Sequence, residues 1–340
     1  MCADETHEIA SKLVQEDKGI LAADESTGTA GKRLASVGLE NIEENRRRYR
    51  KLFFTADNIG DVLSGVILYK ETLDHYDDHG TPFLKLLADE DIIPGVKVDE
   101  GKKPLPRFPG ELVTQGLDDL QERLTDYKAR GAGFTKWRSV TPIDEEKGLP
   151  TDPANRANAR GQALYAAFSQ DAGLVPIVEP EVLINGDHDI DTAEEVTTRT
   201  LEVVFDELDR YNIDYEGMLL KSSMVLPGED CPDQASPEAI AEATVRTFQK
   251  TVPEDVPGIV FLSGGQSPKQ ATENLNAINR QGDQPWELSF SFGRALQGPS
   301  LETWAGDPDN VPAAQEAFQK RLKLTQAARK GEYNADMEVA

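Results

Sequence analysis

One pattern constrains the fold of this chain more than any other. A short apolar run, usually followed by an amphipathic segment, recurs eight times and holds three to seven residues each time. Runs of this kind are typical of parallel strands that are buried on both faces and need not alternate apolar with polar residues. The predicted strands are Gly19–Ala23, Gly65–Tyr69, Ile92–Val98, Gly133–Trp137, Leu174–Val178, Met218–Leu220, Gly258–Leu262 and Leu288–Phe292.

Helical patterns separate most of these runs. Leu120, Leu124 and Tyr127, for example, recur at three- and four-residue spacing. Asp191 or Thr192 is expected to cap a later helix, because short polar side chains accept hydrogen bonds from the first turn. The predicted helices are Leu117–Arg130, Asn155–Asp171, Thr192–Tyr211, Pro237–Thr251, Pro268–Gln281 and Pro312–Lys330, with extra helices in Ser26–Ser64.

Eight strands that alternate with helices favour a (β/α)8 TIM barrel over an open doubly wound sheet. An open sheet of that kind usually has only about five or six parallel strands. We therefore expect an α/β fold with one barrel domain over residues 1–340. It would carry extra N-terminal helices and a short C-terminal tail from about residue 331.

The charge of the chain excludes two classes of partner, nucleic acids and membranes. It has 36 Lys and Arg residues against 61 Asp and Glu, a formal net charge of −25. Nucleic acids need a basic face, and anionic membrane leaflets repel an acidic one. No apolar run is long enough to span a membrane, and Met1–Glu8 lacks the pattern of a signal peptide. With only Cys2 and Cys231 to form a disulfide, a cytoplasmic location is expected.

The residues that close the runs are the candidate functional residues, because barrel enzymes carry their chemistry at the C-terminal ends of the strands. Lysine or arginine stands at several of these ends although the chain is strongly acidic. That excess predicts a positive mouth, with the acidic residues on outer helices and loops. The closing residues are Asp24, Glu25 and Ser26; Lys97 and Asp99; Lys136 and Arg138; Glu179 and Glu181; Lys221; Ser263, Gly264 and Gly265; and Ser291 and Arg294.

Lysines that converge on one mouth suggest amine chemistry. Lys97 and Lys136 near Lys221 would repel one another's charges, and with burial this is expected to lower the lysine pKa values from ~10.4 toward neutrality. A neutral amine attacks a carbonyl to form a Schiff base, and the protonated imine stabilises a carbanion beside it. Carboxylates such as Asp24 and Glu179 would move the protons.

Two features suggest that the carbonyl compound carries phosphate. Ser263–Gly265 offers backbone N–H groups after the seventh run, where barrels often hold phosphate, and Arg294 adds a planar donor fork. Gly28–Arg33 resembles part of an ATP-binding P-loop, but its glycines are too close together and Arg33 stands where Ser or Thr is needed. Lys32 and Arg33 are still candidates for phosphate contact; a solvated helix start is the alternative.

Two further patterns predict no chemistry. His75 and His79 have the spacing of metal ligands on a helix, but no third ligand is evident, so a polar helix end without metal is expected. Arg46–Arg48 is expected to form a solvated helix face.

Nine motifs, in order, resemble those of class I fructose-bisphosphate aldolases, from about residue 4 to about residue 333. They are Gly19–Ser26, Glu44–Arg47, Val66–Thr72, Val96–Asp99, Lys136–Arg138, Ile177–Glu181, Leu219–Lys221, Phe261–Gln266 and Phe290–Gln297. The resemblance implies reversible cleavage of fructose 1,6-bisphosphate to dihydroxyacetone phosphate and glyceraldehyde 3-phosphate, in glycolysis and gluconeogenesis. It also implies a homotetramer that needs no metal and no cofactor.

The resemblance implies roles for individual residues. Lys221 would form the Schiff base, Glu179 would act as acid and base on the carbinolamine with Glu181 as its neighbour, Lys136 would assist, and Asp24 would take the C4 hydroxyl proton. The implied substrate-binding residues are Lys97 and Arg138 along the site, Ser263, Gly264 and Arg294 at the C1 phosphate, Gly265 and Ser291, and Ser26, Lys32 and Arg33 around the other phosphate.

The sequence departs from the family pattern at four places. Ser222–Ser223 replaces the usual Pro-Asn after the Schiff-base lysine, Phe292 replaces Tyr, and Glu302–Trp304 replaces Lys-Ala-Trp. The mobile tail that brings a catalytic Tyr in animal forms is expected to be absent, and Tyr333 is not assigned that role.

Two other functions stay open at this point. One is a different Schiff-base sugar-phosphate aldolase, and the other is a scaffold that binds sugar phosphates without turnover. The four residues Asp24, Lys136, Glu179 and Lys221 argue against the scaffold, because binding alone needs no relay of amines and carboxylates.

Overall fold

Eight parallel strands close into a barrel in the computed structural model, which describes residues 3–339. They are β1 (Gly19–Ala23), β2 (Leu63–Leu68), β3 (Ile93–Lys97), β6 (Phe134–Thr141), β7 (Val175–Val182), β8 (Leu219–Ser222), β9 (Gly258–Phe261) and β10 (Glu287–Phe292). Around the barrel they pair in the order β1-β10-β9-β8-β7-β6-β3-β2. The predicted barrel is confirmed, and each predicted run overlaps one strand.

Two strands extend well past the runs that predicted them. β6 continues from Trp137 to Thr141, and β7 continues from Val178 to Val182. Their extensions carry charged residues at alternate positions, including Arg138. A charged residue ends an apolar pattern in the sequence, but here it occupies the inward face of a continuing strand.

Eleven α-helices lie within residues 3–339, and none is long and apolar enough to cross a bilayer. They are α1 (Ala3–Leu13), α2 (Thr27–Ser36), α3 (Glu43–Phe54), α4 (Phe83–Asp89), α5 (Leu120–Ala129), α6 (Asp152–Asp171), α7 (Ile190–Arg210), α8 (Pro237–Thr251), α9 (Pro268–Asn279), α10 (Arg294–Trp304) and α11 (Val311–Arg329). Five 3-10 turns complete them: η1 (Ile59–Asp61), η2 (Lys70–Asp74), η3 (Tyr215–Gly217), η4 (Pro308–Asn310) and η5 (Ala335–Glu338).

The extra N-terminal helices are α2 and α3, as expected. Helices α1, α4 and α10 were not predicted, and neither was a hairpin of β4 (Lys102–Pro104) and β5 (Leu112–Thr114). The predicted cap of α7 was wrong. Asp189 caps this helix by accepting a hydrogen bond from the Thr192 N–H at 2.8 Å, so the helix begins two residues earlier.

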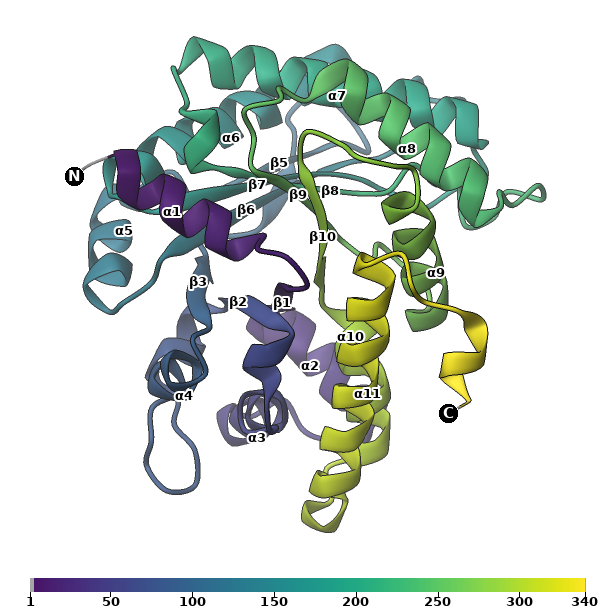
Figure 1. Ribbon diagram of the computed structural model, residues 1–340. Coiled ribbons are helices and arrows are strands. Elements are labelled where there is room, and N and C mark those ends of the chain that lie inside the picture. Colours follow the sequence, from purple (N-terminus) through teal and green to yellow (C-terminus); the bar gives the residue numbers. More distant parts are fainter. Residues whose placement is uncertain (1–2, 340) are drawn as a thin grey trace.

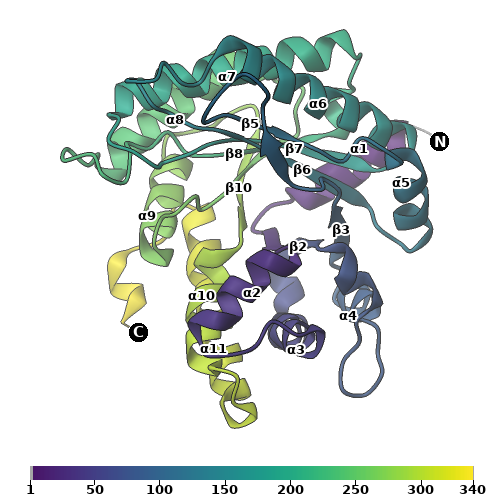
Figure 2. The ribbon, with the colours of Figure 1, turned by 180° about the vertical axis from the view of Figure 1, so that it is seen from behind.

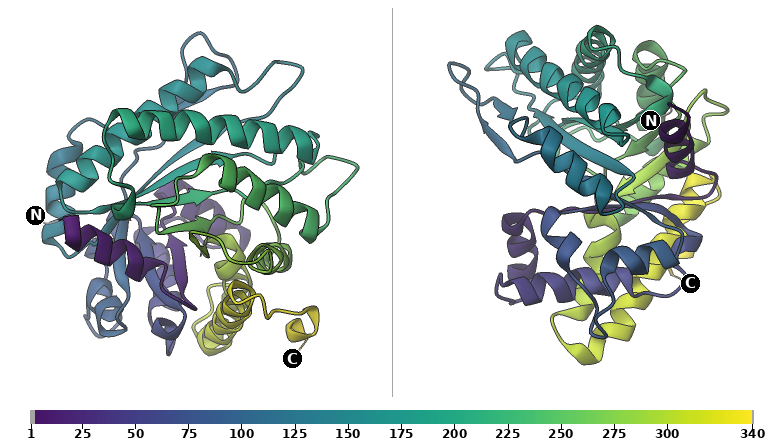
Figure 3. Two further views of the ribbon diagram at one scale, coloured as in Figure 1. Left: turned by 45° about the horizontal axis from the view of Figure 1, so that its top comes forward. Right: turned by 90° about the vertical axis from the view of Figure 1, so that its left-hand side faces the viewer.

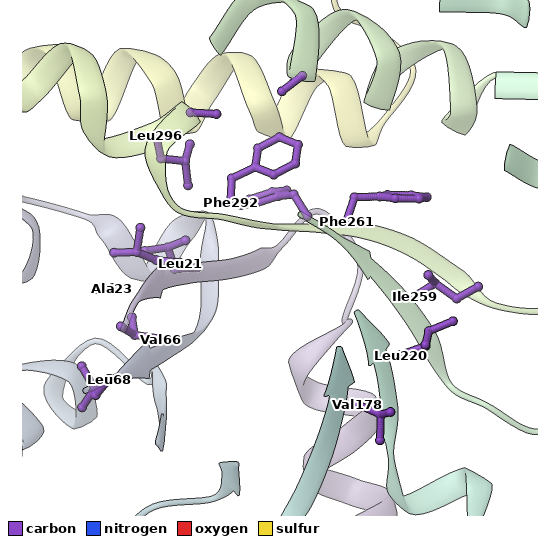
Figure 4. Close-up of a cluster of buried hydrophobic side chains, with 14 of the residues drawn as sticks. Leu21, Ala23, Val66, Leu68, Val178, Leu220, Ile259, Phe261, Phe292 and Leu296 are labelled. Atoms are coloured by element: carbon purple, nitrogen blue, oxygen red, sulfur yellow. The ribbon is translucent and has the colours of Figure 1, made fainter. Parts of the chain in front are cut away.

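One face of the strands packs against the surrounding helices. Figure 4 shows buried side chains from β1, β2, β7, β8, β9 and β10 directed at this layer, with Leu296 of α10 among them. Phe261 and Phe292 are fully buried here. This outer layer forms the larger part of the core, and it fixes the strands so that alternate residues face the barrel axis.

The other face of the strands fills the barrel, and the first helix closes one end of it. Leu13 and Val14, at and just after the end of α1, form one buried cluster with inward residues such as Ile20, Ile177 and Leu219. These strand residues precede the charged residues of the same strands. The chain therefore places an apolar plug at the N-terminal end of the barrel and leaves the C-terminal end for polar groups.

The helices follow one another around the barrel. Helices α6, α7 and α8 lie side by side, as Figure 1 shows, and α9, α10 and α11 continue the layer. Seen from behind, α2 and α3 lie beside α10 and α11 (Figure 2). After α11 the chain ends on the outside of the molecule (Figure 3), where Glu338 pairs with Arg321 at 2.7 Å.

Candidate active site

Strand alternation aims the functional side chains at one cavity. In β6, Lys136 and Arg138 line the cavity, while Trp137 between them stacks on Tyr165 of α6 at 5.5 Å. In β7, Glu179 and Glu181 line the same cavity. The register pairs Arg138 of β6 with Glu179 of β7, so charged residues of the two strands lie side by side.

The cavity has a volume of about 1000 Å³ and opens at the C-terminal ends of the strands. All fifteen predicted site residues line it. Ten Lys and Arg and six Asp and Glu side chains surround it, a formal surplus of four positive charges in a chain of net charge −25. The predicted positive mouth is therefore present.

A buried row of alternating amines and carboxylates crosses the floor of the cavity. Lys221 Nζ lies 3.3 Å from Glu179 Oε1, and Lys136 Nζ lies 2.9 Å from Glu179 Oε2 and 2.7 Å from Asp24 Oδ2. The Lys136 and Lys221 side chains are at most 4% exposed. A proton can move along this row because each neighbouring pair is close to hydrogen-bond distance.

The pKa predicted for the lysines was wrong for Lys136. Burial alone would lower the Lys136 pKa, but the carboxylates of Asp24 and Glu179 outweigh it and raise the pKa above its usual value. Burial likewise disfavours the charged form of both carboxylates, yet their pKa values are lowered because Lys136 and Lys221 lie against them. Lysine repulsion does not dominate here, because carboxylates stand between the lysines.

Two more cations at the rim are paired with carboxylates. Lys97 Nζ lies 2.6 Å from Asp99 Oδ1, and Arg138 pairs with Glu181. Asp99 also accepts hydrogen bonds from the backbone N–H of Gly101 at 3.1 Å and of Arg138 at 3.2 Å. One carboxylate thus joins the end of β3, the middle of β6 and the start of the β4–β5 hairpin.

The turn after β9 has the backbone of an anion-binding loop. Gly264 and Gly265 adopt φ angles of 41° and 89°, which favour glycine. Arg294 is the first residue of α10, which follows the neighbouring strand β10. The buried hydroxyl of Ser291 has no hydrogen-bond partner among the described residues. These groups can donate several hydrogen bonds to one anion.

The third group of predicted residues lies at the start of α2. Ser26 caps the helix by accepting from the Thr29 N–H, so the P-loop-like stretch is part of an ordinary helix. Arg33 pairs with Glu25 and donates to the Tyr49 hydroxyl at 3.1 Å. These contacts hold the guanidinium, and neighbouring Lys32 faces the cavity with no carboxylate partner in residues 3–339.

Other residues line the cavity although they were not among the predicted site residues. Glu25 and Asp99 were named among the residues that close the runs, but no role was assigned to them. Lys102 and Arg123 carried no signal, because they come from the hairpin and from α5, not from the end of a barrel strand.

The remaining sequence patterns lie away from the cavity. His75 follows η2 in an extended conformation, so the pair with His79 is not on a helix, and no metal-like group of His, Cys, Asp or Glu is found in residues 3–339. Cys231 is a buried free thiol, and Cys2 lies outside the described residues. Tyr333 is buried, with its hydroxyl 3.1 Å from Glu338.

Two of the departures from the family pattern lie at hydrogen-bonded or well-packed positions. Ser223 Oγ donates to Val182 O at 2.9 Å, which ties the chain after Lys221 to the preceding strand, β7. Phe292 is fully buried in the outer core. Both sites are therefore satisfied without the usual residues.

The parallel barrel and the cationic cavity at its C-terminal end, with a buried row of lysines and carboxylates, are typical of a barrel enzyme. A family model described as class-I fructose-bisphosphate aldolase matches residues 5–340. The chain belongs to the class I fructose-bisphosphate aldolase family. It is thus a lyase that acts on a phosphorylated sugar.

Individual relatives agree with the family. The probable fructose-bisphosphate aldolase class 1 of Xanthomonas campestris is 48% identical over 98% of this chain and 99% of its own length. The non-muscle aldolase of Lethenteron camtschaticum is 50% identical over 97% and 90%. The crystallised aldolase of Plasmodium falciparum, in complex with TRAP and an inhibitor, has 46% identity and a TM-score of 0.97 over 98% and 97% of the two chains.

Proposed function

We propose that this chain cleaves fructose 1,6-bisphosphate through a Schiff base on Lys221. The observation that carries the proposal is the buried row Lys221–Glu179–Lys136–Asp24, with ion-pair distances of 3.3, 2.9 and 2.7 Å. A binding protein would not need such a row, since burying unneeded charges destabilises the fold.

Glu179 makes the amine of Lys221 a nucleophile. At 3.3 Å its carboxylate can take a proton from Lys221, whose free amine then attacks the C2 carbonyl of the open-chain sugar. The product is a carbinolamine. Glu179 returns the proton to the hydroxyl of this adduct, which leaves as water, and a protonated imine remains.

Asp24 then starts the cleavage of the carbon chain. Asp24 takes the proton of the C4 hydroxyl, and the C3–C4 bond breaks. The electron pair of that bond moves into the protonated imine to give an enamine. Glyceraldehyde 3-phosphate leaves. Protonation of the enamine at C3 and hydrolysis of the imine release dihydroxyacetone phosphate and restore Lys221.

Lys136 acts as a fixed positive charge between the two bases. Because its pKa is raised, it stays protonated and lowers the pKa values of Asp24 and Glu179, which keeps both carboxylates ready to accept protons. Glu181 supports the site through Arg138, with which it pairs.

The remaining predicted residues bind the two phosphates. Ser263, Gly264, Gly265, Ser291 and Arg294 would hold the C1 phosphate, and Ser26, Lys32 and Arg33, with Lys97 and Arg138 along the site, would hold the other. A bisphosphate carries about three to four negative charges near pH 7. The surplus of four positive charges around the cavity supports this assignment.

The test is trapping of the covalent intermediate. Borohydride added with fructose 1,6-bisphosphate should reduce the imine and leave the adduct on the peptide that contains Lys221. Lys221→Met should lower kcat at least ~10³-fold, because the nucleophile is lost. Peptide mass spectrometry and steady-state assays in EDTA measure both effects.

Lys250→Met is the matched control, since Lys250 is an exposed residue of α8 outside the cavity. Its kcat should equal that of the wild type. An adduct on a different lysine, or activity abolished by EDTA, would show that the mechanism is wrong.

We also propose that the protein is a cytoplasmic homotetramer, as the sequence resemblance implies. Light scattering of the purified chain measures the oligomer directly.

A further inference from the structure

Most cations of the mouth already have a carboxylate partner. Six of the ten lie within 4 Å of an Asp or Glu oxygen: Arg33, Lys70, Lys97, Lys136, Arg138 and Lys221. Their charges are compensated before any substrate arrives. The cations without a carboxylate partner can therefore pair with an anionic ligand without giving up an existing ion pair.

Four lining cations have no carboxylate partner in residues 3–339. Arg123 is one, but it donates to backbone carbonyls, including Val98 O at 2.8 Å, so its donors are occupied. Three remain with free donors: Lys32, Lys102 and Arg294. Lys32 and Arg294 belong to the phosphate sites already proposed, whereas Lys102 has no proposed role.

The register of the hairpin turns Lys102 toward the barrel. Lys102 stands opposite Thr114 in the antiparallel β4–β5 pair, so their side chains share one face. Thr114 Oγ1 donates to the backbone carbonyl of Arg138 at 2.9 Å, which fixes this face against β6. Lys103 stands opposite Val113 on the other face, and it does not line the cavity.

The base of the hairpin is held as firmly as its face. Asp99 binds the Gly101 N–H, and the Glu100 N–H donates to Gln115 O at 2.8 Å. The direction of Lys102 is thus set by backbone contacts. Although Lys102 is an exposed residue, partial desolvation of its amine, and then the nearby charge of Arg138, lower its pKa.

The hairpin lies across the mouth from Arg294. In the order of the eight strands, β6 is four strands from β10 in either direction, and β3 is likewise four from β9. Arg294 and Ser263–Gly265 follow β10 and β9, while Lys102 lies over the ends of β3 and β6. The second-phosphate residues proposed above extend toward this side, because Ser26, Lys32 and Arg33 follow β1 and Lys97 ends β3, two strands away and beside the hairpin.

We propose that Lys102 contacts the second phosphate, the one not held by Ser263–Gly265, and sets the preference for a bisphosphate over a monophosphate. The proposal rests on the proposed function, because it assumes that Ser263–Gly265 and Arg294 hold the C1 phosphate. It adds to the site a residue from outside the barrel strands and their helices.

The experiment compares two substrates that differ only in the second phosphate. In Lys102→Ala, KM for fructose 1,6-bisphosphate should rise about tenfold with kcat little changed, because one charge-assisted phosphate contact is lost. The kinetic constants for fructose 1-phosphate should stay within about twofold of wild type. Lys102→Arg should restore most of the bisphosphate KM.

Lys103→Ala is the matched control, with the same charge change on the opposite face of the same strand, and it should behave as the wild type. An unchanged bisphosphate KM in Lys102→Ala, or an equal change for both substrates, would overturn the proposal. A wild type without cleavage of either sugar, or without borohydride trapping, would instead refute the proposed function.

Discussion

Arginines buried outside the catalytic row are also paired with carboxylates, and partly buried Glu71, which pairs with two of them, is the clearest case. It accepts hydrogen bonds from Arg50 at 2.8 Å and from Arg46 at 2.9 Å, and both arginines are buried. Arg46–Arg48 is therefore not the solvated helix face that the sequence predicted. Three consecutive residues cannot share one face of a helix, so at least one of them meets the core.

This pairing predicts a pH-dependent loss of stability in Glu71→Gln. Burial alone would raise the Glu71 pKa, but Arg46 and Arg50 outweigh it and lower the pKa from 4.5 to about 2. The pair therefore stabilises the fold fully above pH 4.5, and this contribution disappears as the pH falls toward 2. Glu71→Gln should cost about 3 kcal/mol of unfolding free energy at pH 7, and less at pH 3.5.

Urea unfolding at the two pH values measures the difference. Glu44→Gln is the control, because Glu44 is 54% exposed in its pair with Arg47, and it should cost under about 1 kcal/mol. An equal loss at both pH values in Glu71→Gln would contradict the pairing argument.

At the scale of elements, helix α1 and the catalytic row occupy opposite ends of one barrel. The N-terminal segment reads as polar and acidic in the sequence, yet Ala10, Leu13 and Val14 form an apolar stripe at its end. This stripe fills the barrel beneath the charged residues. Ala10, Leu13 and Val14 support the strands but do not line the cavity, so stability and chemistry should separate in a variant.

Leu13→Ala tests this separation. The side chain is fully buried, and its loss should lower the unfolding free energy by about 2–5 kcal/mol through the cavity left behind. Its kcat and KM at a temperature well below unfolding should equal those of the wild type. Ile42→Ala, at a 49% exposed residue, should have little effect on either quantity. A large drop in kcat for Leu13→Ala would show that the plug also shapes the mouth.

At the scale of the whole molecule, charge is divided between the surface and the mouth. The chain has a net charge of −25, but the cavity is lined by four more cations than anions. The excess of Asp and Glu residues therefore lies outside the cavity, on the outer helices and loops, as the excess of basic residues at the strand ends predicted. We hypothesise that the acidic exterior keeps the protein solvated, including at high salt concentration.

Salt should therefore act in opposite directions on stability and on substrate binding. Between about 0.05 and 1 M KCl the Debye length falls from more than 10 Å to ~3 Å. Screening should raise the thermal unfolding midpoint by relieving repulsion among acidic residues, and it should raise KM by weakening attraction to the mouth. Thermal melts and steady-state assays across KCl measure both, with an uncharged osmolyte as control. A midpoint that falls steadily with KCl would refute the hypothesis.

The sequence by itself determined the barrel and the residues of its mouth. Buried parallel strands are apolar on both faces, and functional groups lie toward their C-terminal ends, so Asp24, Lys136, Glu179 and Lys221 could be identified as the charged residues at or just beyond the ends of the apolar runs. It missed α1 as the plug and the β4–β5 hairpin, because short or polar segments carry little periodic signal.

Only the tertiary structure decided how the charges compensate one another. Lys136 was expected to lose its proton beside two other lysines, and it instead keeps it between Asp24 and Glu179. The sequence likewise could not predict which of the ten lining cations have no carboxylate partner in residues 3–339. Lys102 is one of them. The physical reason is that electrostatic energy depends on distances across the barrel, and strand order sets those distances while sequence separation does not.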